Sequence, residues 1–182
     1  MKKSKFHIVW LSGMSGAGKS TLAYYIKNIC DDYGYTTRII DGDDVREKDK
    51  KKLGFSYEEI LINNMRIAKY CHALKDKKVN IAIVPVISPY EKIRKKVGDL
   101  LEPNLHLIYL KADIASLRKR DTKGLYLASD RGEINNLIGY SDFSPYEEPM
   151  KPSLIICTGE KNDINKSKEK ILNYFERFIF NK

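Results

Sequence analysis

Five short runs of apolar residues, several of them β-branched, alternate along the chain with longer segments in which apolar residues recur every three or four positions. The short runs predict buried strands, and the longer segments predict helices with one apolar face. The predicted strands are 6–11, 38–40, 79–87, 105–110 and 154–157. The predicted helices are 20–33, 57–77, 91–101, 114–120 and 162–180.

Strands that alternate with helices need crossover connections, because neighbouring parallel strands cannot be joined by a tight turn. Such crossovers are right-handed and place helices on both faces of the sheet. We therefore expect an α/β fold of three layers, with a mostly parallel five-stranded sheet in the middle. In folds of this class, ligands bind at the carboxyl ends of the strands.

Segment 121–152 does not follow the alternation. It is long and mixed in composition, and it is interrupted by Gly124, Gly132, Gly139, Pro145 and Pro149. Loops of this length inside a compact domain are typically lids or binding segments. We therefore expect 121–152 to be a lid over the ligand site.

The length and composition favour one domain over residues 1–182. Of the 182 residues, 42% are hydrophobic, which is enough for one sizeable core but hardly for two. The charged fraction of 31% argues against a membrane span, and the hydrophobic fraction argues against disorder. The three cysteines are an odd number, lie far apart in the sequence and form no CxxC pair, so neither a zinc site nor a disulfide framework is expected. These features predict a cytoplasmic protein without a membrane partner.

The net charge of +9 fits either a nucleic-acid-binding protein or an enzyme that handles several phosphates in one cleft. The basic runs at 46–52 and 91–96 also contain acidic residues, and we expect both to be solvated surfaces. A P-loop switch or nucleic-acid-binding module would need a guanine-selective loop such as NKxD, or a basic face with interleaved aromatics. The sequence has no such loop, so no nucleic-acid partner is expected.

Residues 13–20 read GMSGAGKS and match the pattern GxxxxGK[ST] between a predicted strand and a predicted helix. The glycines allow backbone N–H groups to surround phosphate oxygens, and the helix N-terminus adds further donors. Lys19 would reach the β- and γ-phosphates, and Ser20 would bind Mg²⁺. This P-loop predicts ATP or GTP binding, and the residues expected to contact the nucleotide are Gly13, Ser15, Gly16, Ala17, Gly18, Lys19, Ser20 and Thr21.

An acidic segment, DGDDVR at 41–46, follows the second predicted strand. Carboxylates beside a P-loop can hold Mg²⁺ or accept a proton from an attacking hydroxyl. On an extended backbone, residues two apart point the same way, so we expect Asp41 and Asp43 to face the phosphates and Asp44 to face elsewhere. The alternative is a polar turn that caps a short helix at Val45.

The order of several motifs resembles the adenylyl-sulfate (APS) kinase family over about residues 6–158. The motifs are GMSGAGKST, DGDDVR, LGFS at 53–56, ISPY at 87–90, RDTKGLY at 120–126, GEI at 132–134 and YEEP at 146–149. The resemblance implies a P-loop kinase that uses Mg-ATP to phosphorylate the ribose 3′-hydroxyl of APS, giving 3′-phospho-APS (PAPS) and ADP. Because relatives are often dimers, it also makes a homodimer possible.

The resemblance also implies residue roles. Asp43 would orient or deprotonate the acceptor hydroxyl, Asp41 would support Asp43 and Mg²⁺, and Lys19 and Lys123 would neutralise the transferring phosphates. Arg120 would join the ATP site. The residues implied for the acceptor are Asp43, Arg46, Phe55, Asn63, Ile87, Ser88, Lys123, Gly124 and Leu125. Three of these also have plainer explanations: Phe55 as a core residue, Arg46 as part of the basic run and Asn63 as an exposed helix position.

Several positions depart from the family pattern in the acceptor half. Ile60 replaces an acceptor-contacting arginine, Thr122 replaces a proline, and Leu137 aligns with an aromatic residue that stacks on the adenine of APS. Tyr140 or Phe143 would then have to supply the missing ring. Since a pyrimidine needs less stacking surface, the alternative acceptor is cytidine 5′-diphosphoramidate, which a similar kinase phosphorylates in capsule modification.

Overall fold

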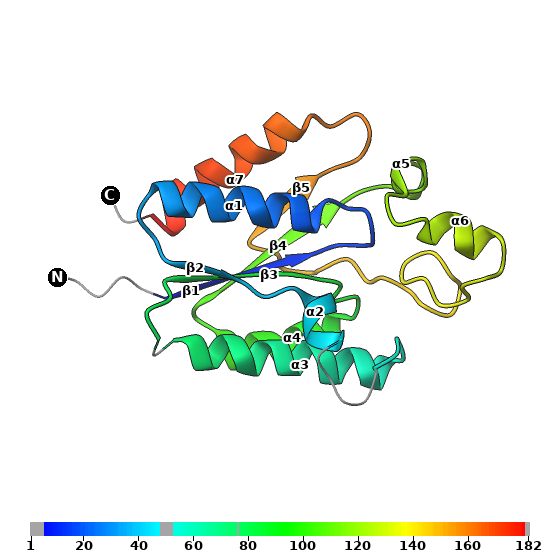
Figure 1. The fold of residues 1–182 in the computed structure, drawn as a ribbon, viewed down its shortest axis with the longest axis horizontal. Coiled ribbons are helices and arrows are strands. Elements are labelled where there is room, and N and C mark those ends of the chain that lie inside the picture. Colours follow the sequence, from blue (N-terminus) through cyan, green and yellow to red (C-terminus); the bar gives the residue numbers. More distant parts are fainter. Residues whose placement is uncertain (1–5, 48–52, 76, 181–182) are drawn as a thin grey trace.

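The computed structural model describes residues 6–47, 53–75 and 77–180, and in this part of the chain it has one sheet of five parallel strands. Their order across the sheet is β2-β3-β1-β4-β5 (Figure 1). The strands are β1 (His7–Ser12), β2 (Thr37–Ile39), β3 (Ile81–Val86), β4 (Leu105–Lys111) and β5 (Leu154–Cys157). Every residue of β1 and β3 is buried, as expected for parallel strands that are covered on both faces.

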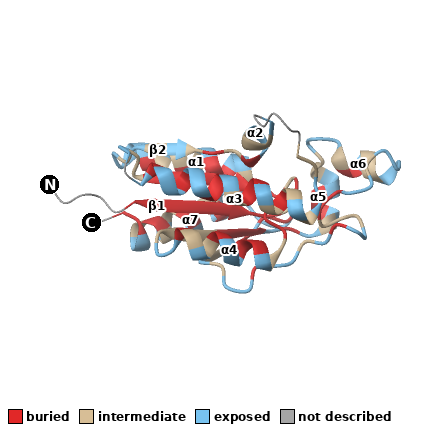
Figure 2. Ribbon diagram, turned by 90° about the horizontal axis from the view of Figure 1, so that it is seen from below, coloured by how far each residue is buried: buried red, intermediate tan, exposed pale blue. Residues whose placement is uncertain are grey.

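Helices cover both faces of the sheet. Figure 1 shows α1 and α7 on one face and α3 and α4 on the other, and in Figure 2 β1 has the colour of buried residues. The helices are α1 (Lys19–Asp32), α2 (Gly42–Glu47), α3 (Tyr57–Leu74), α4 (Glu91–Leu101), α5 (Ile114–Arg120), α6 (Leu125–Asp130) and α7 (Ile164–Phe178). Each face has its own apolar cluster, so the predicted three-layer α/β fold is confirmed.

The α3 helix shows how the sequence fixes a helix start. Ser56 accepts a hydrogen bond from the Glu59 backbone N–H, and the Glu59 carboxylate accepts one from the Ser56 backbone N–H. This reciprocal capping satisfies two N–H groups that the first helical turn leaves free. The start of α3 at Tyr57 is therefore encoded locally.

The structure corrects two predictions about local structure. Segment 41–46 is not extended, because α2 begins at Gly42. Segment 121–152 is not loop throughout, because it contains α6. The basic run at 46–52 lies largely on residues 48–52, outside the described residues.

The strand order places the ends of β1 and its neighbours at one edge of the sheet. The chain goes from β1 to β2, returns to β3 next to β1, and continues to β4 on the other side of β1. This reversal opens a crevice at the carboxyl end of β1, where ligands of α/β proteins bind. Helices α5 and α6 extend beyond the sheet at that end (Figure 1).

Candidate active site

The P-loop follows β1 and leads into α1. Gly18 is the N-cap of α1 and has φ of 91°, a left-handed conformation that favours glycine. Among the described residues, no side chain caps this helix start. The first N–H groups of α1 therefore point outward as free donors, and together with the helix dipole they favour an anion.

Three side chains from distant segments hold the loop in place. The Tyr126 hydroxyl donates to the Ser15 carbonyl at 2.9 Å, and the Thr158 hydroxyl donates to the Ala17 carbonyl at 3.0 Å. Arg120 donates to the Gly16 carbonyl at 3.1 Å and also to the Thr158 carbonyl. The carbonyls are thus turned away from the phosphate side and bonded to protein groups.

Lys19 lies inside the curve of the loop. Its ammonium group donates to the carbonyls of Gly13 at 2.9 Å and Met14 at 2.8 Å. An ammonium group has three N–H donors, so one remains for a phosphate oxygen. The pKa of Lys19 is lowered to about 8, mainly because the side chain is buried; Asp43 and Asp41 oppose this shift, and Lys123 adds to it.

The acidic pair comes from the start of α2. Asp41 precedes the helix, and its carboxylate accepts a hydrogen bond of 2.9 Å from the Asp43 backbone N–H. Asp43 lies in the first turn of α2. Both residues line the same cavity as Lys19, although the extended backbone from which we predicted this arrangement is wrong.

A cavity of about 730 Å³ runs along the carboxyl edge of the sheet. One part is formed by residues 15–22 of the P-loop and α1, and it extends to Arg120 and to residues 158–160 after β5. The other part is formed by Asp41, Asp43, Ile87 and Lys123. Lys123 is exposed, and its ammonium group lies 3.2 Å from the Asp43 carboxylate. The cavity therefore joins a phosphate-binding loop to a carboxylate and a second cation.

Of the residues expected at the acceptor, Arg46 and Phe55 form a pair, and neither is among the residues that line the cavity. The Arg46 guanidinium lies 4.4 Å from the centroid of the Phe55 ring and donates to the Gly54 carbonyl. Phe55 is 43% exposed, so the alternative that it is a core residue is wrong. Burial lowers the pKa of Arg46.

Two other expected acceptor residues are buried. The Asn63 side chain donates to the Gly42 carbonyl at 3.3 Å and therefore supports α2; the alternative of an exposed helix position is wrong. Ser88 belongs to the loop 87–90, between β3 and α4, which we call the acceptor loop. The Ser88 hydroxyl and the Asn63 carbonyl oxygen are buried without a hydrogen-bond partner among the described residues. Gly124 and Leu125 are not among the residues that line the cavity.

The positions that depart from the family pattern are mostly buried. Ile60 is completely buried with Ile93 and Ile138, so it contacts apolar side chains and not the cavity. Leu137 packs into the cluster on the opposite side of the sheet. Tyr140 packs against Tyr126, and Phe143 is 93% exposed. Neither ring is among the residues that line the cavity.

The oxygen groups in the cavity fit Mg²⁺. Ser20 and Asp41 both line it, and Mg²⁺ prefers hard oxygen ligands, usually one or two from the protein with waters and phosphates completing the shell. Within the described ranges, no group of three or more His, Cys, Asp or Glu side chains is arranged to hold a metal ion. Also within these ranges, no helix is long and apolar enough to cross a membrane.

Known proteins resemble the chain over most of its length. Residues 5–157 match the family model of adenylylsulphate kinase. The adenylyl-sulfate kinase of Bacillus licheniformis is 40% identical over 87% of this chain and 79% of its own length. That of Halothermothrix orenii is 34% identical over 97% of this chain and 92% of its own length. The chain belongs to the adenylylsulphate kinase family.

A solved structure agrees with this family assignment. The structure of the Mycobacterium tuberculosis APS kinase in complex with AMPPNP and APS has a TM-score of 0.81 to this fold at 26% identity. The match covers 95% of this chain and 99% of the other. A gluconokinase from Sinorhizobium meliloti, with a TM-score of 0.60 and 14% identity, shares the fold alone.

Sequence reasoning missed several residues of this kinase site. Tyr126 and Thr158 hold the P-loop in place through hydrogen bonds. The sequence contains only weak signals for this role: Tyr126 ends the RDTKGLY motif, and Thr158 follows the last strand. Arg94 belongs to the basic run 91–96 that we expected to be solvated, but it is 5% exposed. Its partners lie in the acceptor loop and at the start of α4, so only the folded structure identifies it.

Proposed function

We propose that this chain is an ATP-dependent adenylyl-sulfate kinase, which transfers the γ-phosphoryl group of ATP to the ribose 3′-hydroxyl of APS and releases PAPS and ADP. The observation that carries the proposal is the single cavity in which Lys19, Asp43 and Lys123 meet. Family membership supplies the donor and acceptor classes.

The donor half of the cavity suits a triphosphate. The free N–H groups at the start of α1 and the Lys19 ammonium present positive charge, and Arg120 lies at the edge of the loop. Phosphoryl transfer passes through a loose transition state, so catalysis consists mainly of positioning and charge neutralisation. Ser20 and Asp41 would hold Mg²⁺, which supplies further neutralisation of the phosphate charge.

The acceptor half provides a base and a cation. Asp43 would accept the proton of the attacking hydroxyl or orient it, and Lys123 would neutralise charge on the transferring group. Their ion pair at 3.2 Å has to open as substrates enter between them. Both side chains are exposed, so opening this pair costs little free energy.

The remaining acceptor contacts are those that the family resemblance implies. Arg46 and Phe55 would provide a cationic and stacking wall, and Ile87 and Ser88 would provide the acceptor loop, with Asn63 behind α2. Gly124 and Leu125 would contribute when Lys123 moves, because they follow it directly. We also propose that residues 1–182 act as one kinase domain. Self-association stays a prediction, although a relative from Thiobacillus denitrificans is a hexameric APS kinase.

A second candidate acceptor is cytidine 5′-diphosphoramidate. It is favoured by one observation: at the family's second stacking position Leu137 is buried in the core, while Phe143 is exposed and away from the cavity lining. Loss of one stacking face weakens a purine by about 1–3 kcal/mol. A smaller base would lose less.

A competition assay separates the two candidates. The protein is given Mg-ATP with APS, cytidine 5′-diphosphoramidate, CDP and AMP, each alone and in pairs, and kcat/KM is determined by mass spectrometry of the products. We expect the highest kcat/KM for APS. A higher kcat/KM for the cytidine compound would replace APS as the acceptor, and tight, salt-sensitive RNA binding without any phosphoryl transfer would contradict the kinase assignment.

A further inference from the structure

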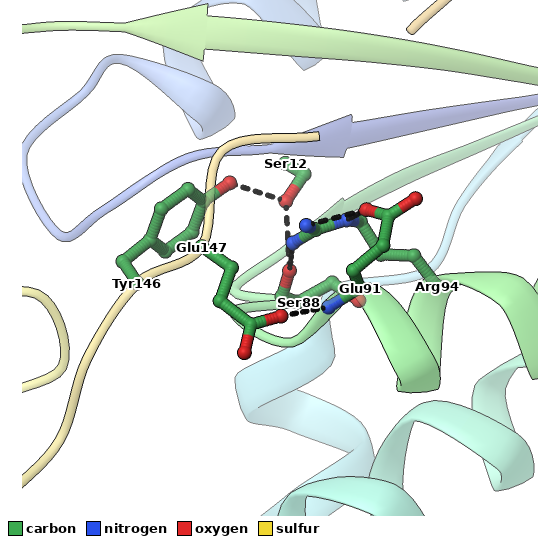
Figure 3. A network of polar contacts seen from close by, with 6 residues as sticks. All are labelled: Ser12, Ser88, Glu91, Arg94, Tyr146 and Glu147. Atoms are coloured by element: carbon green, nitrogen blue, oxygen red, sulfur yellow. Dashed lines mark hydrogen bonds and ion pairs between the residues drawn. The ribbon is translucent and has the colours of Figure 1, made fainter. Parts of the chain in front are cut away.

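A polar network joins three segments behind the acceptor loop. Figure 3 shows Ser12 at the end of β1, Ser88 in the acceptor loop, Glu91 and Arg94 on α4, and Tyr146 and Glu147 in the last part of the lid segment 121–152. These segments are far apart in the sequence. Apart from Ser88, none of the six residues has a role in the proposed reaction.

The Ser88 carbonyl accepts hydrogen bonds from two sides. Arg94 Nη1 donates to it at 2.6 Å from α4, and Ser12 Oγ donates at 3.4 Å from β1. A carbonyl oxygen has two lone pairs, so both are used. The peptide plane after Ser88 is thereby fixed between the strand that leads into the P-loop and the helix that follows the acceptor loop.

Tyr146 connects this hydrogen-bond network to the lid. The Tyr146 hydroxyl and Ser12 Oγ share a hydrogen bond of 2.7 Å. The Tyr146 ring stacks on Tyr109 with centroids 6.0 Å apart. The hydroxyl is therefore held by packing as well as by hydrogen bonding.

Arg94 is positioned by an ion pair. Its Nε and Nη2 both donate to one carboxylate oxygen of Glu91, at 2.9 and 2.7 Å, and the side chain is almost completely buried. Because the Arg94 guanidinium is buried, loss of a partner would leave an uncompensated buried charge. This pairing aims Nη1 at Ser88.

Glu147 attaches the lid segment to the acceptor loop itself. Its backbone N–H donates to the Pro89 carbonyl at 2.8 Å, and its carboxylate accepts from the Glu91 backbone N–H at 2.6 Å. The N-cap residue of α4, Tyr90, makes no side-chain cap. Glu147 therefore caps α4 from a distant segment.

We propose that Tyr146, Arg94 and Glu147 are positioning residues, which hold the acceptor loop at a fixed place relative to the P-loop and to the end of the lid. The proposal rests on the proposed function for its kinetic consequence. Ile87 lines the cavity and the Ser88 hydroxyl is buried without a described partner, so a shift of this loop misplaces the acceptor. The triphosphate site is braced separately by Tyr126, Thr158 and Arg120.

The test uses Tyr146→Phe, which removes only the hydroxyl, and Tyr174→Phe as its matched control. The Tyr174 hydroxyl is also half-buried and hydrogen-bonded, to His106 at 2.7 Å, but it lies away from the cavity. We expect Tyr146→Phe to raise KM for APS about tenfold, the loss expected for one hydrogen bond, while KM for ATP stays within about twofold. Tyr174→Phe should change neither.

A second readout does not depend on the acceptor. Amide hydrogen exchange at residues 87–92 should be faster in Tyr146→Phe than in wild type and unchanged in Tyr174→Phe. If Tyr146→Phe does not fold, Glu147→Ala replaces it, because Glu147 is exposed and its loss should likewise speed exchange and raise KM for APS.

The outcomes distinguish this proposal from the proposed function. Failure of the wild type to phosphorylate APS contradicts the function alone, and hydrogen exchange then decides the positioning role. Unchanged exchange at 87–92, or an equal rise in KM for ATP and APS, would overturn the positioning role even in an active enzyme.

Discussion

Lys19 is a cation whose environment makes its charge sensitive to pH near neutrality. Burial lowers its pKa to about 8. Above this pH, a growing share of the free protein carries a neutral Lys19, whereas a bound triphosphate favours the ammonium form. Binding must then take up a proton, so the affinity for ATP falls as the pH rises.

We therefore predict that the dissociation constant for Mg-ATP rises by up to about tenfold per pH unit above pH 8. Titration calorimetry between pH 7 and 9.5 measures it. Lys19→Arg is the control, because a guanidinium stays protonated throughout this range and its profile should be flat. A flat profile in the wild type would contradict the lowered pKa of Lys19.

Replacing Asp43 should have a large effect on kcat and only a small effect on the stability of the protein. Asp43→Asn should lower kcat by about 10²–10⁴-fold, the range for a general base, and leave Mg-ATP binding within about twofold. Single-turnover kinetics and calorimetry measure both quantities. Because the Asp43–Lys123 pair is exposed, the free energy of unfolding should change by no more than about 1 kcal/mol.

The matched control is Asp44→Asn, since Asp44 is also exposed in the first turn of α2 but does not line the cavity. It should retain wild-type turnover. A normal kcat in Asp43→Asn would remove Asp43 as the proposed base.

Helix α2 is the element that places the acidic pair, and its position depends on a close approach at Gly42. A methyl group there would lie 2.6 Å from Val86 Cγ2 on β3. We predict that Gly42→Ala lowers the free energy of unfolding by about 1–3 kcal/mol through overpacking and also reduces kcat, because Asp43 shifts with the helix. Denaturant unfolding and steady-state kinetics measure the two effects.

Gly98→Ala on α4 is the control for backbone entropy. A methyl group at Gly98 would meet only Leu105 Cδ2 at 4.0 Å, so this change should be neutral or slightly stabilising. Adding Val86→Ala to Gly42→Ala should recover part of the loss. Wild-type stability in Gly42→Ala would contradict the close packing of α2 on β3.

Some helices and strands are easier to predict from the sequence than others. The strands and the longer helices were predictable, because long apolar runs and capping signals such as Ser56 and Glu59 act locally. The short helix α2 was expected only as the alternative to an extended segment and α6 was not expected, because their starts contain glycine and aspartate, which also suit turns. The Asn63 bond to Gly42 and the packing against β3 favour α2, and both come from distant segments.

At the scale of the whole molecule, the donor and acceptor halves of the site differ in how far sequence predicts them. The P-loop is one continuous motif, so its residues, its glycine conformations and its place after β1 follow from a single segment. The acceptor half is assembled from α2, the acceptor loop, α4 and the lid. Neither the burial of Ile60 and Arg94 nor the exposure of Phe143 can be derived from spacing alone.

The candidate site explains only part of the net charge of +9. Lys19, Arg120 and Lys123 line the cavity, where two anionic substrates would meet. Several other basic residues in the described part of the chain lie on exposed helix faces, such as Lys95 and Lys96 on α4. The charge therefore favours phosphate-bearing substrates without requiring a nucleic-acid partner.

In the proposed reaction, the γ-phosphoryl group passes directly from ATP to the acceptor hydroxyl within one cavity. The most direct measurement is ³¹P NMR of the products formed from APS and ATP labelled in its γ-phosphoryl group with ¹⁸O. We predict that the labelled phosphoryl group appears on the ribose 3′-oxygen of PAPS and that the amount of labelled PAPS equals the amount of ADP. Label released as inorganic phosphate while APS stays unmodified would contradict it.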